Sequence, residues 1–146
     1  WKELLRQVHP DKFAAQGAAA QRLAMQWSVR INEAYQRLKD PLARASYLCE
    51  LNGAPIQAEN NTAMPSAFLM QQMTWRESLE DANSLLELEQ LANETHAAQK
   101  TQLTLIARSL DHDKDPIKAA GEVRSLMFIQ RFASEVETRI DLLLPS

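Results

Sequence analysis

Apolar side chains recur at helical spacing along most of the chain, and prolines and glycines interrupt the pattern at a few points. The first apolar stripe consists of Trp1, Leu4, Leu5 and Val8. This spacing predicts a short helix with one apolar face. Pro10 cannot donate a backbone hydrogen bond and disfavours helical geometry at His9, so we expect this helix to end there. After a short polar loop, a second helix is predicted from about Ala19 to Leu38.

The second predicted helix also carries a broad apolar stripe. Its members are Leu23, Trp27, Ile31, Ala34, Tyr35 and Leu38. They follow one another at helical intervals, which places them on one face. Because Trp27 and Tyr35 are large packing residues, we interpret this face as the core face of the first domain.

Local signals mark a third, short helix and a linker behind it. Asp40-Pro41 is typical of an N-cap followed by proline at the first helical position. The helix is predicted to run to about Leu51 and to end at Asn52-Gly53, since glycine favours the geometry that follows a helix. Residues 53–64 hold further breakers and no apolar periodicity, so we predict a linker there.

From Pro65 to the end of the sequence the apolar pattern is helical again. Ser84-Leu85-Leu86-Glu87 fits a capping box, and Asp115-Pro116 fits an N-cap with proline behind it. Three helices are therefore predicted, at roughly 65–82, 84–111 and 115–144. Such a succession predicts an up-down-up bundle.

The predicted fold is all-α, with two units. A helical hairpin and a short helix fill residues 1–52, a linker follows at 53–64, and a three-helix bundle fills 65–146. Residues 1–52 carry eight Lys/Arg against five Asp/Glu, whereas the remainder carries eight against fourteen. A basic first third and an acidic remainder indicate that the two units have different partners.

Composition disfavours several classes of function. With 45% hydrophobic and 24% charged residues, the sequence is typical of a soluble globular protein. The basic excess is small and has few interleaved aromatics, so no nucleic-acid partner is expected. No apolar run approaches the roughly 18–20 residues that span a membrane, and no signal peptide is visible. We therefore expect a bacterial cytoplasmic protein without a membrane partner, whose true N-terminus precedes Trp1.

Cofactor and metal chemistry are not expected either. Cys49 is the single cysteine, which excludes an internal disulfide, and its apolar neighbours predict a core position. His112 lies near Asp113 and Asp115, but no second His or Cys accompanies it, and aspartates in a turn commonly cap helices. No cofactor and no metal site are predicted.

The most specific chemical signal is the tetrapeptide His9-Pro10-Asp11-Lys12. A proline-stiffened tip would hold His9 and Asp11 exposed, and residues displayed by a stiff scaffold commonly serve in recognition. Asp and Pro also form ordinary turns, so the motif alone does not decide its role. A hydrolase or lyase using His9 and Asp11 is disfavoured, because residues flanking a proline cannot readily face one another. Nothing nearby offers a nucleophile or an oxyanion hole.

This hairpin resembles helices II and III of a J-domain, the module that drives ATP hydrolysis in DnaK-type chaperones. The resemblance rests on Leu5, His9-Pro10-Asp11-Lys12, Ile31-Asn32-Glu33-Ala34-Tyr35-Gln36-Arg37-Leu38 and Asp40-Pro41-Leu42-Ala43-Arg44-Ala45-Ser46-Tyr47-Leu48. Phe13 and the ending Arg44-Ala45-Ser46-Tyr47-Leu48 resemble the HscB-type co-chaperones of iron–sulfur cluster assembly. The first J-domain helix is missing from the sequence, so we expect part of the first apolar stripe to be uncovered.

The resemblance implies a DnaK-like partner of the HscA type. Carried over by position, His9-Pro10-Asp11 triggers ATP hydrolysis by that chaperone. Lys2, Arg6 and Lys12 then supply the positive charge that attracts a negative surface of its ATPase domain. Charges of this kind mainly raise the association rate, and salt weakens them.

The helix after Pro65 carries more apolar surface than one core stripe needs. The expected core face consists of Phe68, Trp75, Leu79 and Ala82. Beside it lie Leu69, Met70 and Met73, with Glu77 one turn beyond. The extra residues either pack under the linker or against the first domain, or they form an exposed patch that marks a binding surface. Methionine suits such a surface because its flexible thioether adapts to a partner.

Here the resemblance to HscB-type proteins becomes position-specific. The segment from Ala67 to Glu77 matches the family segment that binds the iron–sulfur scaffold protein of the IscU type. The resemblance assigns contact positions to Leu69, Met70, Met73, Glu77 and, from the last helix, Phe128. Thr74 departs from the family, which often has an acid there, so one charge at the rim of the surface is absent.

The sequence thus predicts a monomeric co-chaperone that catalyses no reaction itself. It would stimulate the ATPase of an HscA-type chaperone and deliver an IscU-type scaffold protein to it. The alternative is a general J-domain co-chaperone that delivers unfolded client proteins.

Overall fold

The computed structural model describes residues 1–57 and 64–144, and all regular elements within these ranges are helical. Contacts group the chain into two compact units, Trp1–Arg44 and Ala45–Ser146. This division falls within the third helix, α3 (Pro41–Leu51). Half of the predicted linker, residues 58–63, lies outside the described residues, and the domain boundaries at 52 and 65 stay a prediction.

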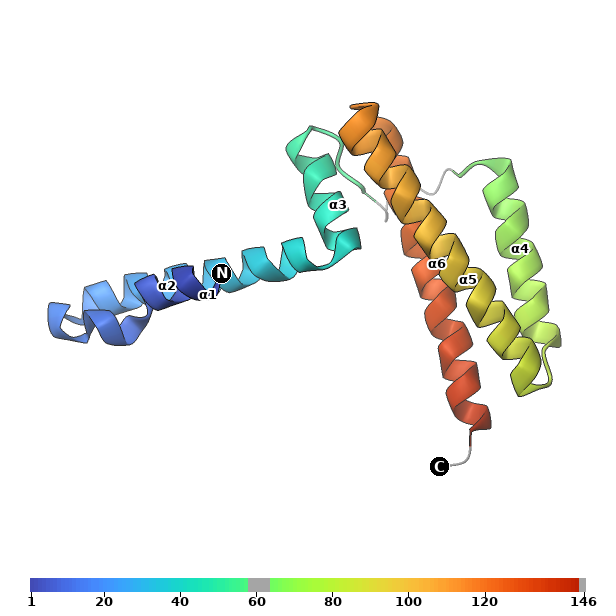
Figure 1. Ribbon diagram of the computed structural model, residues 1–146, viewed down its shortest axis with the longest axis horizontal. Helices are drawn as coiled ribbons and strands as arrows, with labels where there is room; N and C mark the ends of the chain where they lie inside the picture. Colours follow the sequence, from blue (N-terminus) through green and yellow to red (C-terminus); the bar gives the residue numbers. More distant parts are fainter. Residues whose placement is uncertain (58–63, 145–146) are drawn as a thin grey trace. The chain divides into compact units, whose positions relative to one another are not determined.

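The first unit is a helical hairpin. It consists of α1 (Lys2–Val8), the 3-10 helix η1 (Pro10–Gln16) and α2 (Ala18–Lys39), drawn in blue to cyan in Figure 1. As predicted, α1 ends at the residue before His9. The segment predicted as a loop is a 3-10 helix instead. Pro10 occupies its first position and the His9 side chain caps it, accepting a hydrogen bond from the backbone N–H of Asp11 at 3.2 Å.

Contacts at both ends of α1 hold it against α2. The Trp1 ring stacks on Tyr35 with 4.0 Å between the ring centroids, and its Nε1 donates to Asn32 Oδ1 at 2.9 Å. At the other end, Ser28 Oγ donates to the carbonyl of Val8 at 3.4 Å. These contacts hold α1 in place on α2, and the tip that follows α1 therefore starts from a fixed helix.

The predicted core face of α2 is largely wrong. Leu23, Trp27 and Leu38 expose 56%, 50% and 47% of their surface, and Ala34 is exposed as well. Ile31 and Tyr35 are half-buried, and Ala24, which the prediction left out, is the buried residue of α2. Among the described residues, α1 covers one side of α2, and the remaining apolar side chains of α2 are in contact with solvent.

The start and end of α3 follow the predicted signals. Asp40 Oδ2 accepts a hydrogen bond from the backbone N–H of Ala43 at 2.8 Å, as an N-cap does. After the helix, Gly53 adopts a φ of 78°, and the backbone N–H of Ala54 donates to the carbonyl of Cys49 at 2.9 Å. This is the Schellman ending, in which glycine supplies the left-handed residue.

The second unit contains the predicted bundle of α4 (Ser66–Asp81), α5 (Leu85–Ala107) and α6 (Pro116–Leu143). Helix α5 continues as a short π-helical turn, Arg108–His112. Figure 1 shows that α4 and α6 run in the same direction and that α5 runs opposite to both. Ser84 and Asp115 cap their helices as predicted, accepting backbone hydrogen bonds at 3.2 and 3.1 Å.

A well-packed core joins the three helices of this bundle. Its buried members are Trp75, Leu79, Ala82, Leu88, Leu91, Ile129, Phe132 and Val136, with Phe68 packed against them. The predicted core face of α4 is thereby confirmed.

Cys49 is fully buried, as predicted, and burial raises the pKa of its thiol. No helix within residues 1–57 and 64–144 combines the length and the apolar character needed to cross a bilayer.

Candidate partner-binding sites

The hairpin tip displays its polar residues to solvent. The side chains of His9 and Asp11 are both exposed, and the backbone N–H of Lys12 donates to the carbonyl of His9 at 3.0 Å. Pro10 is half-buried, whereas His9 and Asp11 on either side of it are exposed. The predicted recognition residues thus stand accessible on a hydrogen-bonded turn.

The three predicted steering cations are exposed in the same unit. Lys2 and Arg6 lie on α1, and Lys12 lies on η1 immediately after the tip. The ammonium of Lys2 lies 5.9 Å from the centroid of the Trp1 ring, a contact that leaves the charge in solvent. None of these cations has a carboxylate partner within ion-pair distance among the described residues. Their charge is available to an acidic surface.

The geometry of His9 and Asp11 also bears on the enzymatic alternative. We expected the two side chains not to face each other, yet His9 Nδ1 lies 3.6 Å from Asp11 Oδ2. This distance is too long for a hydrogen bond, and Nδ1 already accepts the backbone N–H of Asp11. An Nδ1 used as acceptor carries no proton to donate to a carboxylate. The pair lacks the base-and-orienter hydrogen bond that general-base catalysis uses.

Helix α4 presents two apolar faces with opposite environments. Toward the core, Trp75 and Leu79 are buried, and Trp75 stacks on Phe132 of α6 with 5.6 Å between ring centroids. Away from the core, Leu69, Met70 and Met73 expose 47%, 67% and 63% of their surface, and Glu77 is exposed. The expectation of extra apolar surface on this helix is met. Within the bundle, no core contact covers these three side chains.

The residue predicted from the last helix lies at the surface of the same bundle. Phe128 of α6 is half-buried, and the guanidinium of Arg131 lies 5.6 Å from the centroid of its ring. An aromatic ring with a cation over one face keeps part of its apolar surface available to a partner.

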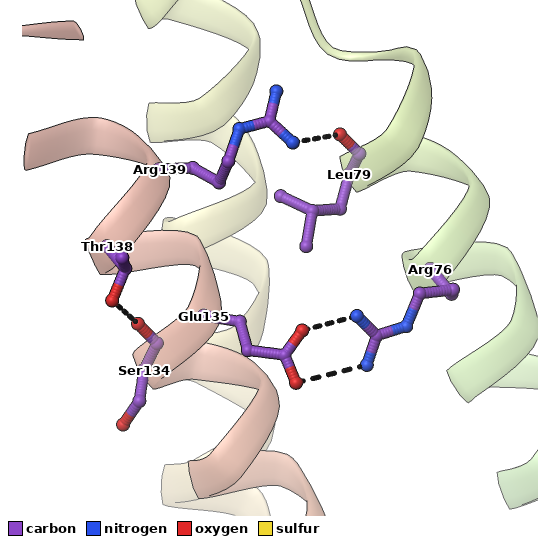
Figure 2. Close-up of polar contacts among 6 residues, drawn as sticks. All are labelled: Arg76, Leu79, Ser134, Glu135, Thr138 and Arg139. Atoms are coloured by element: carbon purple, nitrogen blue, oxygen red, sulfur yellow. Dashed lines mark hydrogen bonds and ion pairs between the residues drawn. The ribbon is translucent and has the colours of Figure 1, made fainter. Parts of the chain in front are cut away.

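Polar contacts fasten α4 to α6 beside the core (Figure 2). The guanidinium of Arg76 binds both carboxylate oxygens of Glu135, and the Nη2–Oε1 distance is 3.3 Å. Further along, Arg139 of α6 donates to the carbonyls of Leu79 and Ala82 at 3.2 and 3.1 Å. The bond to Arg76 holds the pKa of Glu135 below its ordinary value, and the same bond raises the pKa of Arg76. These ties were not predicted, because their partners lie about 60 residues apart and no local pattern connects them.

The turn before α6 shows capping contacts at the residues considered for a metal. His112 Nδ1 and Asp113 Oδ1 lie 3.0 Å apart, and this contact lowers the pKa of Asp113. Asp115 caps α6 through Lys118. Within residues 1–57 and 64–144, no group of three or more His, Cys, Asp or Glu side chains is placed to hold a metal ion.

Comparison with known proteins gives a consistent result. Residues 64–137 match the family model described as the HSCB C-terminal oligomerisation domain. Co-chaperone protein HscB homologs from Paraburkholderia phymatum and Burkholderia multivorans are 50% and 51% identical, over 98% of this chain and 83% of theirs. Among solved structures, chaperone HscB from Vibrio cholerae has a TM-score of 0.80 at 35% identity, covering 98% of this chain and 85% of its own. Human co-chaperone HscB has a TM-score of 0.78 at 28% identity, covering 97% and 69%.

A helical hairpin followed by a three-helix bundle, with relatives of this kind, defines an all-helical co-chaperone. The chain belongs to the HscB family of co-chaperones, which confirms the family predicted from the sequence.

Proposed function

We propose that this protein stimulates the ATPase of a specialised DnaK-like chaperone of the HscA type and delivers an IscU-type scaffold protein to it. The setting would be iron–sulfur cluster assembly in the bacterial cytoplasm. In this proposal His9-Pro10-Asp11 with Lys2, Arg6 and Lys12 contacts the chaperone. The scaffold protein is bound by Leu69, Met70, Met73, Glu77 and Phe128.

The observation that carries the proposal is the exposed apolar face of α4. Its three large side chains are exposed on a helix whose opposite face is tightly packed, so their exposure does not come from a loose fold. A contiguous apolar patch with the charged Glu77 at its rim is typical of a protein-binding surface. The hairpin tip supplies a second, chemically different surface on the other unit.

Two sites on one chain account for the delivery step. A scaffold protein bound to the bundle stays at high effective concentration near a chaperone bound to the hairpin. Each interface alone can therefore be weak, which permits release after each ATPase cycle. Steering by Lys2, Arg6 and Lys12 would raise the association rate with an acidic chaperone surface and would weaken in salt.

Asp11→Asn tests the role of the hairpin. The change removes one exposed carboxylate charge and preserves side-chain size, so the fold should be unaffected. We expect stimulation of the HscA-type ATPase to be lost in steady-state phosphate release, with scaffold binding unchanged. Glu33→Gln on α2 is the matched control, because it removes the same charge from an exposed position of the same unit. A variant that stimulates normally would contradict the assignment of the tip.

Changing Leu69, Met70 and Met73 together to Ala tests the α4 surface. Because all three are exposed, the bundle should stay folded, while the affinity for the IscU-type scaffold falls by several kcal/mol if they are hot spots. Titration calorimetry measures the loss, and Leu86→Ala serves as control, since Leu86 is equally exposed in the same unit.

A reduced, unfolded polypeptide in the same titration separates the proposal from general client delivery. Binding to the folded scaffold alone supports the proposal. Binding to the unfolded chain through the same three residues would favour the general co-chaperone.

A further inference from the structure

The proposed scaffold-binding surface is built from two helices that do not follow one another in the sequence. Leu69, Met70 and Met73 come from α4, whereas Phe128 comes from α6, and the whole of α5 lies between them. Sliding one helix along the other would separate the two parts of the surface. What fixes their relative height is therefore part of the site, provided that the proposed function holds.

The position of α4 along α6 is set by a series of contacts whose partners are separated by a nearly constant number of residues in the sequence. Trp75 stacks on Phe132, Arg76 binds Glu135, and Arg139 binds the carbonyl of Leu79. Partners in these contacts are all about 60 positions apart in the sequence. Because α4 and α6 run in the same direction, equal steps along both helices lead to facing positions (Figure 1).

On each helix, seven residues, or about two helical turns, separate the member of the Arg76–Glu135 pair from the residue of the proposed surface. Leu69 lies seven residues before Arg76, and Phe128 lies seven residues before Glu135. In parallel helices these steps place Leu69 and Phe128 at the same height. The pair thus lies on the same edge of the two helices as the residues it would align.

The chemistry of the pair suits alignment better than the neighbouring contacts do. A planar guanidinium that binds both oxygens of a carboxylate fixes distance and direction together. The Arg76 guanidinium also lies 5.1 Å from the centroid of the Phe132 ring, which restricts it from a third side. A stacked pair such as Trp75–Phe132 tolerates small slides. Among the described residues, Arg76–Glu135 is the ion pair that joins α4 to α6.

We propose that Arg76 and Glu135 are positioning residues. They hold α4 in register with α6, so that Leu69 and Met73 form one continuous scaffold-binding surface with Phe128. Figure 2 shows the two side chains directed at each other across the gap between the helices. Each side chain has the other as its ion-pair partner.

A charge exchange tests this. Scaffold binding is measured by titration calorimetry for the unaltered chain, Arg76→Glu, Glu135→Arg and the double variant carrying both. Each single variant places like charges opposite each other, and we expect it to bind the IscU-type scaffold about tenfold more weakly. The double variant restores an opposite-charge pair and should return to within about threefold of the unaltered chain.

Two controls make the result specific. Glu137→Arg imposes the same charge change on an exposed position of the same helix, without a partner on α4, and should bind normally. Thermal unfolding followed by circular dichroism confirms that each variant is folded at the temperature of titration.

Two outcomes would contradict the positioning role, and a third would contradict the proposed function. If Arg76→Glu and the double variant are equally weak, Arg76 contacts the scaffold protein directly and the positioning role is wrong. It is also wrong if Glu135→Arg binds like the unaltered chain. If the unaltered chain itself does not bind the scaffold, the proposed function fails first, and the positioning role fails with it.

Discussion

Both units expose large apolar side chains, but the helices that carry them differ in how much of their remaining surface is buried. In the first unit, Leu23, Trp27 and Leu38 stand out from a helix in which Ala24 is the buried residue. In the second unit, the exposed residues of α4 lie opposite a face whose Trp75 and Leu79 are only 5% exposed. A similar degree of exposure therefore has a different meaning in each unit.

The contrast shows that exposure alone does not identify a binding surface. An apolar face can remain open beside a hairpin in which few side chains are buried, as in the groove lined by Trp1, Leu4, Ile31, Ala34, Tyr35, Leu38 and Lys39. An apolar face on a helix whose opposite face already packs in a core is not needed for that core, and we propose a binding role for it. The second case applies to α4, whose packing does not require Met70 or Met73.

The largest expected effect comes from replacing tryptophan in each unit. Trp75→Ala removes a buried ring that stacks on Phe132, and should lower the free energy of unfolding of the bundle by about 3–5 kcal/mol. Trp27→Ala removes a ring that is half exposed and should cost less than about 1 kcal/mol. Urea denaturation followed by circular dichroism measures both. Similar losses for the two variants would remove the distinction between the units.

An intermediate effect is expected at the contact that holds the hairpin together. Trp1→Ala removes the stack on Tyr35 and the hydrogen bond to Asn32, so the docking of α1 should weaken by about 1–2 kcal/mol. Faster hydrogen exchange of the amides of α1 reports this opening. Glu3→Ala, on an exposed position of the same helix, is the control and should leave exchange unchanged. If Trp1→Ala exchanged no faster, the tip would not depend on this brace.

The smallest expected effect concerns the Arg76–Glu135 pair and pH. Because the pKa of Glu135 is lower in the folded protein than its ordinary value of 4.5, the pair stabilises the fold above that pH. As pH falls below 4.5 and Glu135 takes up a proton, this contribution is lost. Both groups are partly exposed, so it should amount to less than about 1 kcal/mol.

Glu135→Gln isolates this contribution from the other carboxylates. The difference in unfolding free energy between the unaltered chain and Glu135→Gln should be largest near neutral pH and should shrink in acid. A difference that is the same at all pH values would mean that the charge of Glu135 does not stabilise the bundle.

Local sequence signals predicted the helices closely. The caps at Asp40, Ser84 and Asp115, and the glycine ending at Gly53, lie where the sequence placed them. Such signals act between residues a few positions apart, so the sequence contains both partners of each contact within one window. The 3-10 helix after His9 was missed because its N-cap is a histidine, which is outside the usual capping residues.

The candidate sites were predictable to a different degree. The α4 surface could be found because its apolar residues exceed one helical stripe, and the structure confirms that they are exposed. The same logic was largely wrong for α2, where the stripe predicted a core face but Leu23, Trp27 and Leu38 are exposed. Periodicity identifies the face of a helix, but it does not show whether another element lies on it.

By itself, the sequence determined the helical class, the limits of the helices, and the residues of the hairpin tip and of the α4 surface. These properties depend on side chains close together in the chain. Only the tertiary structure decided which apolar faces are covered, and that Arg76 meets Glu135 and Arg139 meets Leu79. Contacts between residues so far apart arise only when the helices have packed, because packing alone sets the height of one helix against another.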